Sequence, residues 1–389
     1  MPGSGTAQFV ILLASVLKPV DDTRMRGKFA KTLAERAGTQ VHIAGRGTTS
    51  AGANPANSGL HPIFSGTRLS LGRLAAQWRY GQLLRRLKPG VVIVHAPELL
   101  PLTLLWQALG TGRKFLYDIR ENYALNVSTQ RVYQGFMRHG LAAGLRWVEE
   151  LAARRAAGVI LAEASYAAEL PFLNELQPGR VVVLENKYQP QPDETLRPQP
   201  IKLPPPTEPL RLLYSGTISE LNGVWEAIAL AQQLRAAWPG GARLTIIGFC
   251  QQPELLRQLL AEAAQHPAWL TLIGGAEPVP HARIVAEIGR SHLGLLPYRP
   301  HASTERCRPT KLFEYLAHGL PVLAASNPLW QELLAAHGAG LPLAFGQLID
   351  GPALVARLQG HCFYPNGIPG DVLWAGEGKK LWHLLDSVI

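Results

Sequence analysis

Residues 308–326 read RPTKLFEYLAHGLPVLAAS and pass from a helix directly into a strand. Pro309 suits the first turn of a helix, and Gly319 with Pro321 suits its end, so we predict a helix of about three turns. The apolar residues that follow it predict a buried strand. A short, well-bounded helix followed by a strand is typical of a βαβ unit.

The same order of apolar runs and helix-length segments recurs along the whole chain. This alternation predicts parallel sheets covered by helices. In the first half, strands are expected at residues 9–15, 40–45, 91–96, 114–119, 158–162 and 181–186. In the second half, they are expected at residues 210–216, 242–248, 270–274, 293–298, 321–326 and 340–345.

A proline-rich segment, residues 186–209, interrupts this alternation and predicts an interdomain linker. We therefore predict an α/β protein with two Rossmann-like, doubly wound domains, which fits a length of 389 residues. The domains are residues 1–185 and 210–374, and a terminal helix, 375–389, is expected to pack back across the domain boundary. Because ligands bind beyond the carboxyl ends of parallel strands, two such domains facing each other place a site in the cleft between them.

The composition favours a folded protein, with 47% hydrophobic and 17% charged residues. The apolar run at residues 9–17 is too short to span a bilayer, and no basic segment precedes it. The three cysteines, Cys250, Cys307 and Cys362, lack any CxxC spacing, so they predict neither a disulfide framework nor a zinc site. We expect a cytoplasmic protein.

The formal net charge of +10 lies entirely in the first half of the chain. Residues 1–185 contain 22 Lys and Arg against 12 Asp and Glu, whereas residues 186–389 contain 16 of each kind. This asymmetry predicts an anionic partner for the first half, and a solvated basic surface is the alternative.

Several common catalytic motifs are absent from the sequence. No GxxxxGK[ST], GxSxG or HExxH occurs, and the GSG at residues 3–5 precedes the first expected strand, so P-loop, dinucleotide, serine hydrolase and zincin sites are not indicated. Residues 214–223, YSGTISELNG, leave a strand through small residues and open a helix whose N-terminal amides can meet a phosphate. An ordinary turn is the alternative.

Taken with the stretch at 308–326, this loop resembles the retaining, GT-B-fold glycosyltransferases of family 4. The matching segments are DDTRM at 21–25, HAPELLPL at 95–102, YDIRE at 117–121, LLYSGTISELNG at 212–223 and KLFEYLAHGLPVLAAS at 311–326. The last of these is the most specific. The resemblance implies a nucleotide-sugar donor site mainly on the C-terminal domain and an acceptor site on the N-terminal domain.

The resemblance implies roles for the helix at 310–317. Glu314 matches the second glutamate of the family's E-x7-E motif, which contacts ribose hydroxyls, and Lys311 is expected to approach the diphosphate. An exposed ion pair is the alternative. The first glutamate of the motif would fall at Arg306, and Glu305 is one residue away. The implied donor-binding residues are Ser215, Gly216, Thr217, Asn222, Gly223, Tyr298, Arg306, Arg308, Lys311 and Glu314.

The sequence departs from the family at the phosphate clamps. Thr217 and Asn222 stand where the family commonly has Arg and Lys. We expect a basic cluster of Arg306, Arg308 and Lys311 to replace the missing cations. A degenerate, non-catalytic relative is the alternative.

On the N-terminal domain, His95 matches a histidine that the family places beside the reacting sugar. His95 and Glu314 are thus the residues expected at the reacting centre, and a core histidine is the alternative for His95. The acceptor-side residues are expected to be Asp22, Arg24, Glu98, Asp118 and Glu121. One of the carboxylates that follow strands is expected to act as base for the acceptor hydroxyl. Arg24 is expected to hold an acceptor phosphate, and Asp22 has helix capping as its alternative.

The resemblance therefore implies a hexosyltransferase that moves a sugar from a nucleotide diphosphate to a glycan, lipid-linked or small-molecule acceptor, with retention and without a metal or other cofactor. A role in polysaccharide biosynthesis follows from such acceptors. The rival functions are a sugar-nucleotide 2-epimerase on the same fold and a non-catalytic nucleotide- or glycan-binding protein. No nucleic-acid recognition motif accompanies the basic charge.

Two basic segments, 68–89 and 131–156, carry Trp, Phe and Met beside Arg. Helices of this kind lie on anionic membranes, which would place the protein on the inner face of the membrane. The alternative is that these apolar residues form the core faces of ordinary Rossmann helices.

Overall fold

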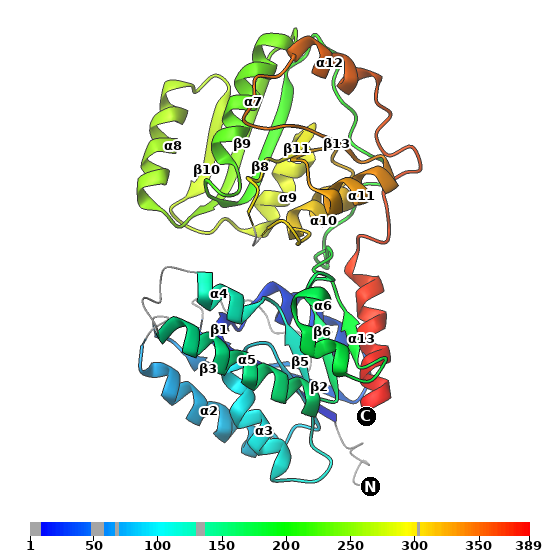
Figure 1. The fold of residues 1–389 in the computed structure, drawn as a ribbon. Helices are drawn as coiled ribbons and strands as arrows, with labels where there is room; N and C mark the ends of the chain where they lie inside the picture. Colours follow the sequence, from blue (N-terminus) through cyan, green and yellow to red (C-terminus); the bar gives the residue numbers. More distant parts are fainter. Residues whose placement is uncertain (1–8, 48–57, 67–69, 130–136, 302–303) are drawn as a thin grey trace. The chain divides into compact units, whose positions relative to one another are not determined.

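The computed structural model describes residues 9–47, 58–66, 70–129, 137–301 and 304–389, and Figure 1 shows their course. The chain divides into two compact units. Unit 1 comprises Met1–Gln189 with Trp374–Ile389, and unit 2 comprises Pro190–Leu373. Each unit is built on an open parallel sheet with helices on its faces, as the alternation of the sequence predicts.

The sheet of unit 1 has the strand order β3-β2-β1-β4-β5-β6-β7. Its strands are β1 (Phe9–Pro19), β2 (Thr39–Arg46), β3 (Ser58–Phe64), β4 (Val91–Val94), β5 (Lys114–Ile119), β6 (Gly158–Leu161) and β7 (Val181–Val183). All neighbouring strands are parallel. The chain winds outward in both directions from β1 and β4, so the doubly wound prediction is confirmed. The sequence did not predict β3, because Pro62 interrupts its apolar run; β3 is an edge strand, where a proline is tolerated.

The helices of unit 1 cover both faces of this sheet. They are η1 (Thr23–Ala30), α1 (Lys31–Ala34), α2 (Gly72–Leu87), η2 (Pro97–Leu99), α3 (Leu100–Ala108), α4 (Tyr123–Thr129), α5 (Met137–Arg155), α6 (Tyr166–Glu169), η3 (Pro171–Glu175) and α13 (Trp374–Val388). The segments predicted at 68–89 and 131–156 correspond to α2 and α5; residues 68, 69 and 131–136 lie outside the described chain.

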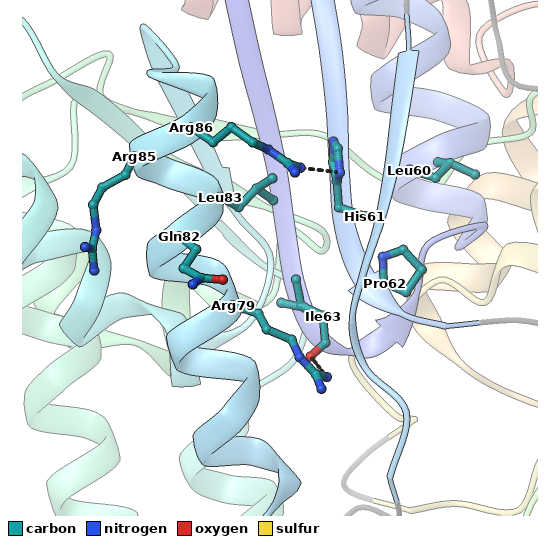
Figure 2. A pocket seen from close by; sticks show the side chains of 9 residues that line it. All are labelled: Leu60, His61, Pro62, Ile63, Arg79, Gln82, Leu83, Arg85 and Arg86. Carbon is teal, nitrogen blue, oxygen red and sulfur yellow. Dashed lines mark hydrogen bonds between the residues drawn. The ribbon is translucent and has the colours of Figure 1, made fainter.

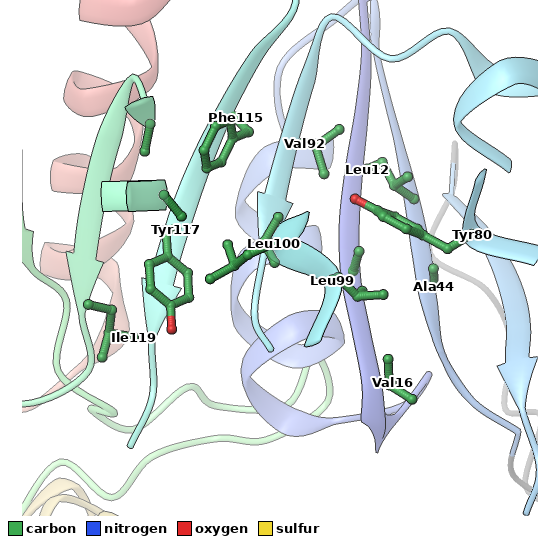
Figure 3. Packing of buried hydrophobic residues seen from close by; sticks show 14 of the residues in the cluster. Leu12, Val16, Ala44, Tyr80, Val92, Leu99, Leu100, Phe115, Tyr117 and Ile119 are labelled. Atoms are coloured by element: carbon green, nitrogen blue, oxygen red, sulfur yellow. The ribbon is translucent and has the colours of Figure 1, made fainter. Parts of the chain in front are cut away.

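Alternate residues of the strands point to opposite faces, as a period of two requires. Leu12 and Val16 pack with α2, α3 and α5 (Figure 3), whereas Ile11 and Leu13 pack with η1 and α13. The terminal helix α13 therefore completes the core of unit 1. Its first residue, Trp374, donates a 2.9 Å hydrogen bond from Nε1 to Thr32, which confirms the return of the terminal helix to the N-terminal domain.

The sheet of unit 2 has the order β10-β9-β8-β11-β12-β13, again with parallel neighbours. Its strands are β8 (Leu210–Ile218), β9 (Ala242–Cys250), β10 (Leu270–Gly275), β11 (Leu293–Leu296), β12 (Val322–Ala324) and β13 (Gly340–Pro342). Its helices are α7 (Val224–Ala237), α8 (Pro253–Gln265), α9 (His281–Arg290), α10 (Thr310–Ala317), α11 (Pro328–His337) and α12 (Gly351–Gly360). The strand order reverses between β8 and β11.

The proline-rich segment forms no helix or strand over residues 190–209, but it packs against unit 2. Ile201 is buried, and its amide donates to the carbonyl of Gly319 at 2.9 Å. Within the described ranges, none of the helices has both the length and the apolar character needed to cross a membrane.

Candidate functional site

The point where the strand order of unit 2 reverses lies between β8 and β11, and it is the expected ligand position in an open α/β sheet. Gly216, near the end of β8, has φ +91°, and Gly223, at the start of α7, has φ +78°. A side chain at Gly223 would place its β-carbon 1.8 Å from the carbonyl oxygen of Pro297. Only glycine therefore allows the loop after β8 to approach the loop after β11 so closely.

Lys311 lies at this reversal point, on α10. A β-carbon at Gly216 would lie 3.3 Å from Cε of Lys311, so the lysine covers the backbone of that loop. Its Nζ lies 4.8 Å from the ring centre of Tyr214 and 5.2 Å from that of Tyr298. Nζ is buried and has no hydrogen-bond partner within the part of the chain that the structure describes. Burial lowers the pKa of Lys311 from 10.5 to about 7.

Glu314 lies one helical turn beyond Lys311 and is also buried. Its Oε1 pairs closely with Nε2 of His281, the first residue of α9. Every residue of α10 after Thr310 is buried, which differs from the single apolar face that the sequence suggested. Tyr315 contributes to this burial, because its hydroxyl lies 2.9 Å from Oγ of Ser215 at the end of β8.

A cavity of about 280 Å³ lies beyond the ends of β11 and β12, in unit 2. Its lining includes Tyr298, whose ring also faces Lys311, and Glu305, whereas Arg306 is not among the lining residues. Glu305 is therefore the glutamate of this turn that reaches the cavity, one residue before the position that the resemblance implies. Arg299 and Glu226 also line the cavity, and they form an ion pair at 2.5 Å.

The remaining predicted donor residues take different positions. Asn222 donates from Nδ2 to the carbonyl oxygen of Thr217 at 3.0 Å, so these two residues close the loop after β8. Arg306 is exposed, and Arg308 pairs with Glu332 of α11 at 3.4 Å. The compact cluster of Arg306, Arg308 and Lys311 that the sequence suggested does not fit this arrangement, because Lys311 is buried against the loop after β8.

The reversal point of unit 1, between β1 and β4, holds a buried charge network. Asp118, on β5, accepts two hydrogen bonds from Arg24, at 2.9 Å to Oδ2 and 2.6 Å to Oδ1. It accepts a third from Nδ1 of His95 at 2.6 Å. Nη1 of Arg24 donates to the carbonyl oxygen of Leu184 and to Asn186. Every guanidinium nitrogen of Arg24 thus has a protein acceptor.

These contacts decide the protonation states in the network. Burial alone would raise the pKa of Asp118, but Arg24 and His95 lower it well below its ordinary value. Burial lowers the pKa of His95 despite its bond to Asp118, so the imidazole is neutral. Since Nδ1 carries the proton, Nε2 has a lone pair, and this atom is buried without a partner among the described residues.

Two predicted acceptor-side roles do not fit this geometry. Arg24 is buried and fully bonded, so it is not arranged to hold an acceptor phosphate. Asp118 is a poor base, because Arg24 and His95 stabilise its carboxylate and hold its pKa well below the ordinary value. Asp22 caps η1 by accepting from the amides of Arg24 and Met25, which is the alternative that the sequence left open.

The other acceptor-side carboxylates are also paired. Glu98 lies 2.5 Å from Nη2 of Arg73, and Glu121 lies 3.0 Å from Nζ of Lys18. Sequence reasoning missed His281 and Arg299. Arg299 directly follows a predicted strand, which is a signal that could have identified it; His281 opens a helix far from the matching motifs and carries no such signal.

None of the residues that the structure describes form a group of three or more His, Cys, Asp and Glu side chains able to hold a metal ion. The three cysteines are free thiols.

Residues 25–187 match the family described as Glycosyl transferase 4-like domain. The match lies within unit 1 and covers less than half of the chain. The matched residues include His95 and Asp118 of the buried network, but neither Arg24 nor α10. A search of curated protein sequences finds no match to the chain.

Solved structures similar to the whole chain include sucrose-phosphate synthase from Thermosynechococcus elongatus, with a TM-score of 0.66, 12% identity and coverage of 98% of this chain and 99% of that one. HepE from Anabaena, in complex with UDP-glucose, has a TM-score of 0.59 and 13% identity, with coverage of 98% and 100%. A putative UDP-N-acetylglucosamine 2-epimerase from Listeria monocytogenes has a TM-score of 0.62 and 11% identity, with coverage of 98% and 96%. The predicted GT-B fold is confirmed, and with the domain match it supports a glycosyltransferase.

Proposed function

We propose that the protein transfers a hexosyl group from a nucleotide diphosphate sugar to a hydroxyl of a glycan, lipid-linked or small-molecule acceptor, with retention of configuration. The bond between the sugar and the diphosphate breaks, and the nucleoside diphosphate leaves with the bonding electron pair and therefore with one more negative charge than it has in the donor. A glycosidic bond to the acceptor oxygen forms, and the proton of the acceptor hydroxyl passes to the leaving diphosphate or to solvent. Catalysis would rest on positioning and on stabilising the leaving diphosphate.

The observation that carries this proposal is the buried Lys311 at the reversal point of unit 2. Its ammonium group lies in a cage of two tyrosine rings and has no hydrogen-bond acceptor among the residues described. A diphosphate over Gly216 would supply the missing negative charge. Glu314, fixed by His281, would accept the ribose hydroxyls of the same nucleotide.

The acceptor side of the proposal uses His95. Its neutral imidazole offers Nε2 as a hydrogen-bond acceptor, which suits a sugar hydroxyl better than an anion. Since His95 is buried, side chains around it must move to admit a sugar. The proposal includes independence of metal ions, because Lys311 supplies the charge for the leaving group; unchanged turnover after EDTA treatment is the expected result. It also includes a location in the cytoplasm.

The test is thermal unfolding against UDP, GDP, ADP and TDP, repeated with Lys311→Ala and Glu314→Ala. A nucleotide at about a hundred times its dissociation constant adds roughly 2.7 kcal/mol of stability. Matched controls are Lys202→Ala and Glu254→Ala, which alter exposed side chains of the same unit. A shift with one nucleotide that both site variants lose and both controls keep supports the site. If no nucleotide shifts the unfolding transition, the assignment of the donor site to Lys311 and Glu314 is wrong, and a degenerate, non-catalytic binding protein becomes the better hypothesis.

The similarity in fold to a putative epimerase supports a sugar-nucleotide 2-epimerase as a second candidate function. An epimerase would convert the nucleotide sugar without an acceptor, whereas a transferase leaves the donor's sugar unchanged until an acceptor is present. Mass spectrometry and NMR of the products formed from the donor alone distinguish the two, since an epimer of the donor would favour the second candidate.

A further inference from the structure

The exposed side of α2 in unit 1 carries a stripe that changes from apolar to cationic. Leu74, Trp78, Gly81, Arg85 and Lys88 follow one another at intervals of four and three residues, so they lie along one side of the helix. Leu74 is 70% exposed and Trp78 is 62% exposed. Large apolar side chains with this exposure on one stripe are the mark of a surface that contacts something apolar.

The neighbouring helix α3 continues the same surface. Leu105 and Leu109 are 52% and 71% exposed, and they line a groove of about 730 Å³ between α3 and α2. The two helices are in contact at Gly81, where a β-carbon would lie at an ordinary van der Waals distance, 3.5 Å, from Cδ2 of Leu102. Arg85 and Lys88 of α2 also line the groove, as does Arg113. The groove thus has leucine walls and a cationic margin.

Apart from Arg73, which pairs with Glu98, the cations of α2 and its C-terminal Lys88 have no carboxylate partner among the described residues. No Asp or Glu occurs between residues 71 and 97, and in the described chain no carboxylate lies within ion-pair distance of Arg79, Arg85, Arg86 or Lys88. In contrast, Arg24, Arg120 and Lys18 at the reversal point of unit 1 are all paired with carboxylates. The excess positive charge of the N-terminal half is therefore available on the α2 side.

The other flank of α2 strengthens this charge. Figure 2 shows a second hollow, of about 640 Å³, where α2 meets the edge strand β3. Arg79 donates to the carbonyl oxygen of Ile63 at 3.1 Å, and Nη2 of Arg86 lies 3.3 Å from Nδ1 of His61. Both guanidinium groups bond to neutral partners and keep their charge, and Arg85 lines this hollow as well as the groove.

We propose that this α2–α3 face, defined by Leu74, Trp78, Arg85, Lys88, Leu105, Leu109 and Arg113, docks on an anionic lipid bilayer. The leucines and the tryptophan enter the boundary between headgroups and acyl chains, and the cations contact lipid phosphates. The exposed leucines favour a lipid surface over a nucleic acid as the partner, because a nucleic acid has no apolar phase for them to enter. The proposal does not depend on the donor site, since docking requires no nucleotide.

The test is cosedimentation of the whole protein with phosphatidylcholine vesicles, with and without an equal amount of phosphatidylglycerol, in the absence of nucleotide. The apolar variant is Leu74→Ser/Trp78→Ser/Leu105→Ser, and the charge variant is Arg85→Gln/Lys88→Gln. Leu260→Ser and Leu348→Ser are matched controls, because these side chains are 52% and 93% exposed but lie in unit 2. Lys202→Gln/Lys379→Gln is the charge control.

We expect binding to the anionic vesicles only, roughly fivefold weaker for each cation removed, weakened further by salt, and lost in the apolar variant. The controls should bind as the unaltered protein does. Circular dichroism melts identify any variant that fails to fold, and for such a variant the corresponding single substitutions decide. The proposal is overturned if the unaltered protein ignores anionic vesicles, if controls and face variants lose binding equally, or if the face instead mediates a dimer or oligonucleotide binding with no vesicle binding.

Discussion

The buried ammonium group of Lys311 makes nucleotide binding dependent on pH. Burial lowers its pKa from 10.5 to about 7, so above neutrality most of the folded, ligand-free protein carries a neutral amine at this position. A diphosphate beside Nζ favours the charged form, so binding must take up a proton. We expect the protein to take up about one proton per nucleotide sugar bound at about pH 8.5 and close to none at about pH 6. Above neutral pH, the affinity should fall about tenfold for each pH unit.

The size of the effect follows from the same burial. A fall in pKa from 10.5 to about 7 corresponds to roughly 4 to 5 kcal/mol, which is an upper limit because the two tyrosine rings offset part of the desolvation. Below pH 7 the folded state bears the full free-energy cost of burying a charged lysine. This cost disappears as the pH rises toward 10.5, because Lys311 is then neutral in the folded state and increasingly neutral in the unfolded state. Lys311→Met should therefore be more stable than the unaltered protein at pH 6 and should lose nucleotide binding.

The assay is isothermal titration calorimetry in buffers with different enthalpies of ionisation, which gives the number of protons exchanged. A nucleotide sugar is the better ligand, because its diphosphate has no proton to exchange in this range. Lys311→Arg keeps a permanent charge and should abolish the proton uptake, whereas Lys202→Arg, at an exposed lysine of the same unit, should not alter it. Proton uptake that is absent in the unaltered protein, or that persists in a Lys311→Arg variant still able to bind, would refute this reasoning.

Three further predictions concern the framework of the site. Asp118→Asn leaves Arg24 without its counter-ion and should lower the free energy of unfolding in urea by about 3 to 5 kcal/mol at pH 7. Because Arg24 and His95 lower the pKa of Asp118, the difference in stability between the variant and the unaltered protein should shrink below about pH 4. Equal stabilities at pH 7 would contradict this prediction. Burial raises the pKa of Glu149 from 4.5 to about 7, so Glu149→Gln should gain up to about 3 kcal/mol at pH 8 and nothing at pH 4, measured by thermal unfolding at both pH values. Gly223→Ala should lower the free energy of unfolding in denaturant more than Gly112→Ala does. Both glycines have positive φ, so alanine adds about 1 kcal/mol or more of backbone strain at each position, but only Gly223 lies against another segment of backbone. Equal losses of stability would show that the loop after β8 moves to accommodate the new side chain.

Periodicity in the sequence was sufficient to predict most of the fold. A buried parallel strand appears as a continuous apolar run, and the runs around Leu12, Val92 and Leu295 have this form because each strand is covered on both faces. The strand β3 lies at the edge, where one side faces no neighbour, so its run tolerates Pro62 and loses the pattern. The same logic explains α10, whose burial on all sides cannot be read from a helical period.

The candidate site was less predictable, because the sequence places residues at strand ends but does not say which of them pair. Arg24 and Asp118 are 94 positions apart, and their pairing depends on how η1 turns its side chains inward beside β5. Lys311 could be assigned to the site because a distinctive motif surrounds it. His281 could not, since its partner Glu314 lies 33 positions away on another helix.

The two reversal points differ in a way that assigns them different ligands. In unit 1 the cations of the reversal point are neutralised by carboxylates of the protein, and the group that keeps an unused acceptor atom is the buried, neutral imidazole of His95, which suits a hydroxyl. In unit 2, Nζ of Lys311 has no hydrogen-bond partner among the described residues, and Glu314 acts on it only as a nearby charge, so a ligand can supply a directly bonded anion. A nucleotide diphosphate therefore fits unit 2 and an uncharged sugar hydroxyl fits unit 1. The anionic partner that the net charge of the N-terminal half predicts is then best sought at the α2–α3 face, where Arg85 and Lys88 have no carboxylate partner among the described residues, and not among the acceptor residues of unit 1.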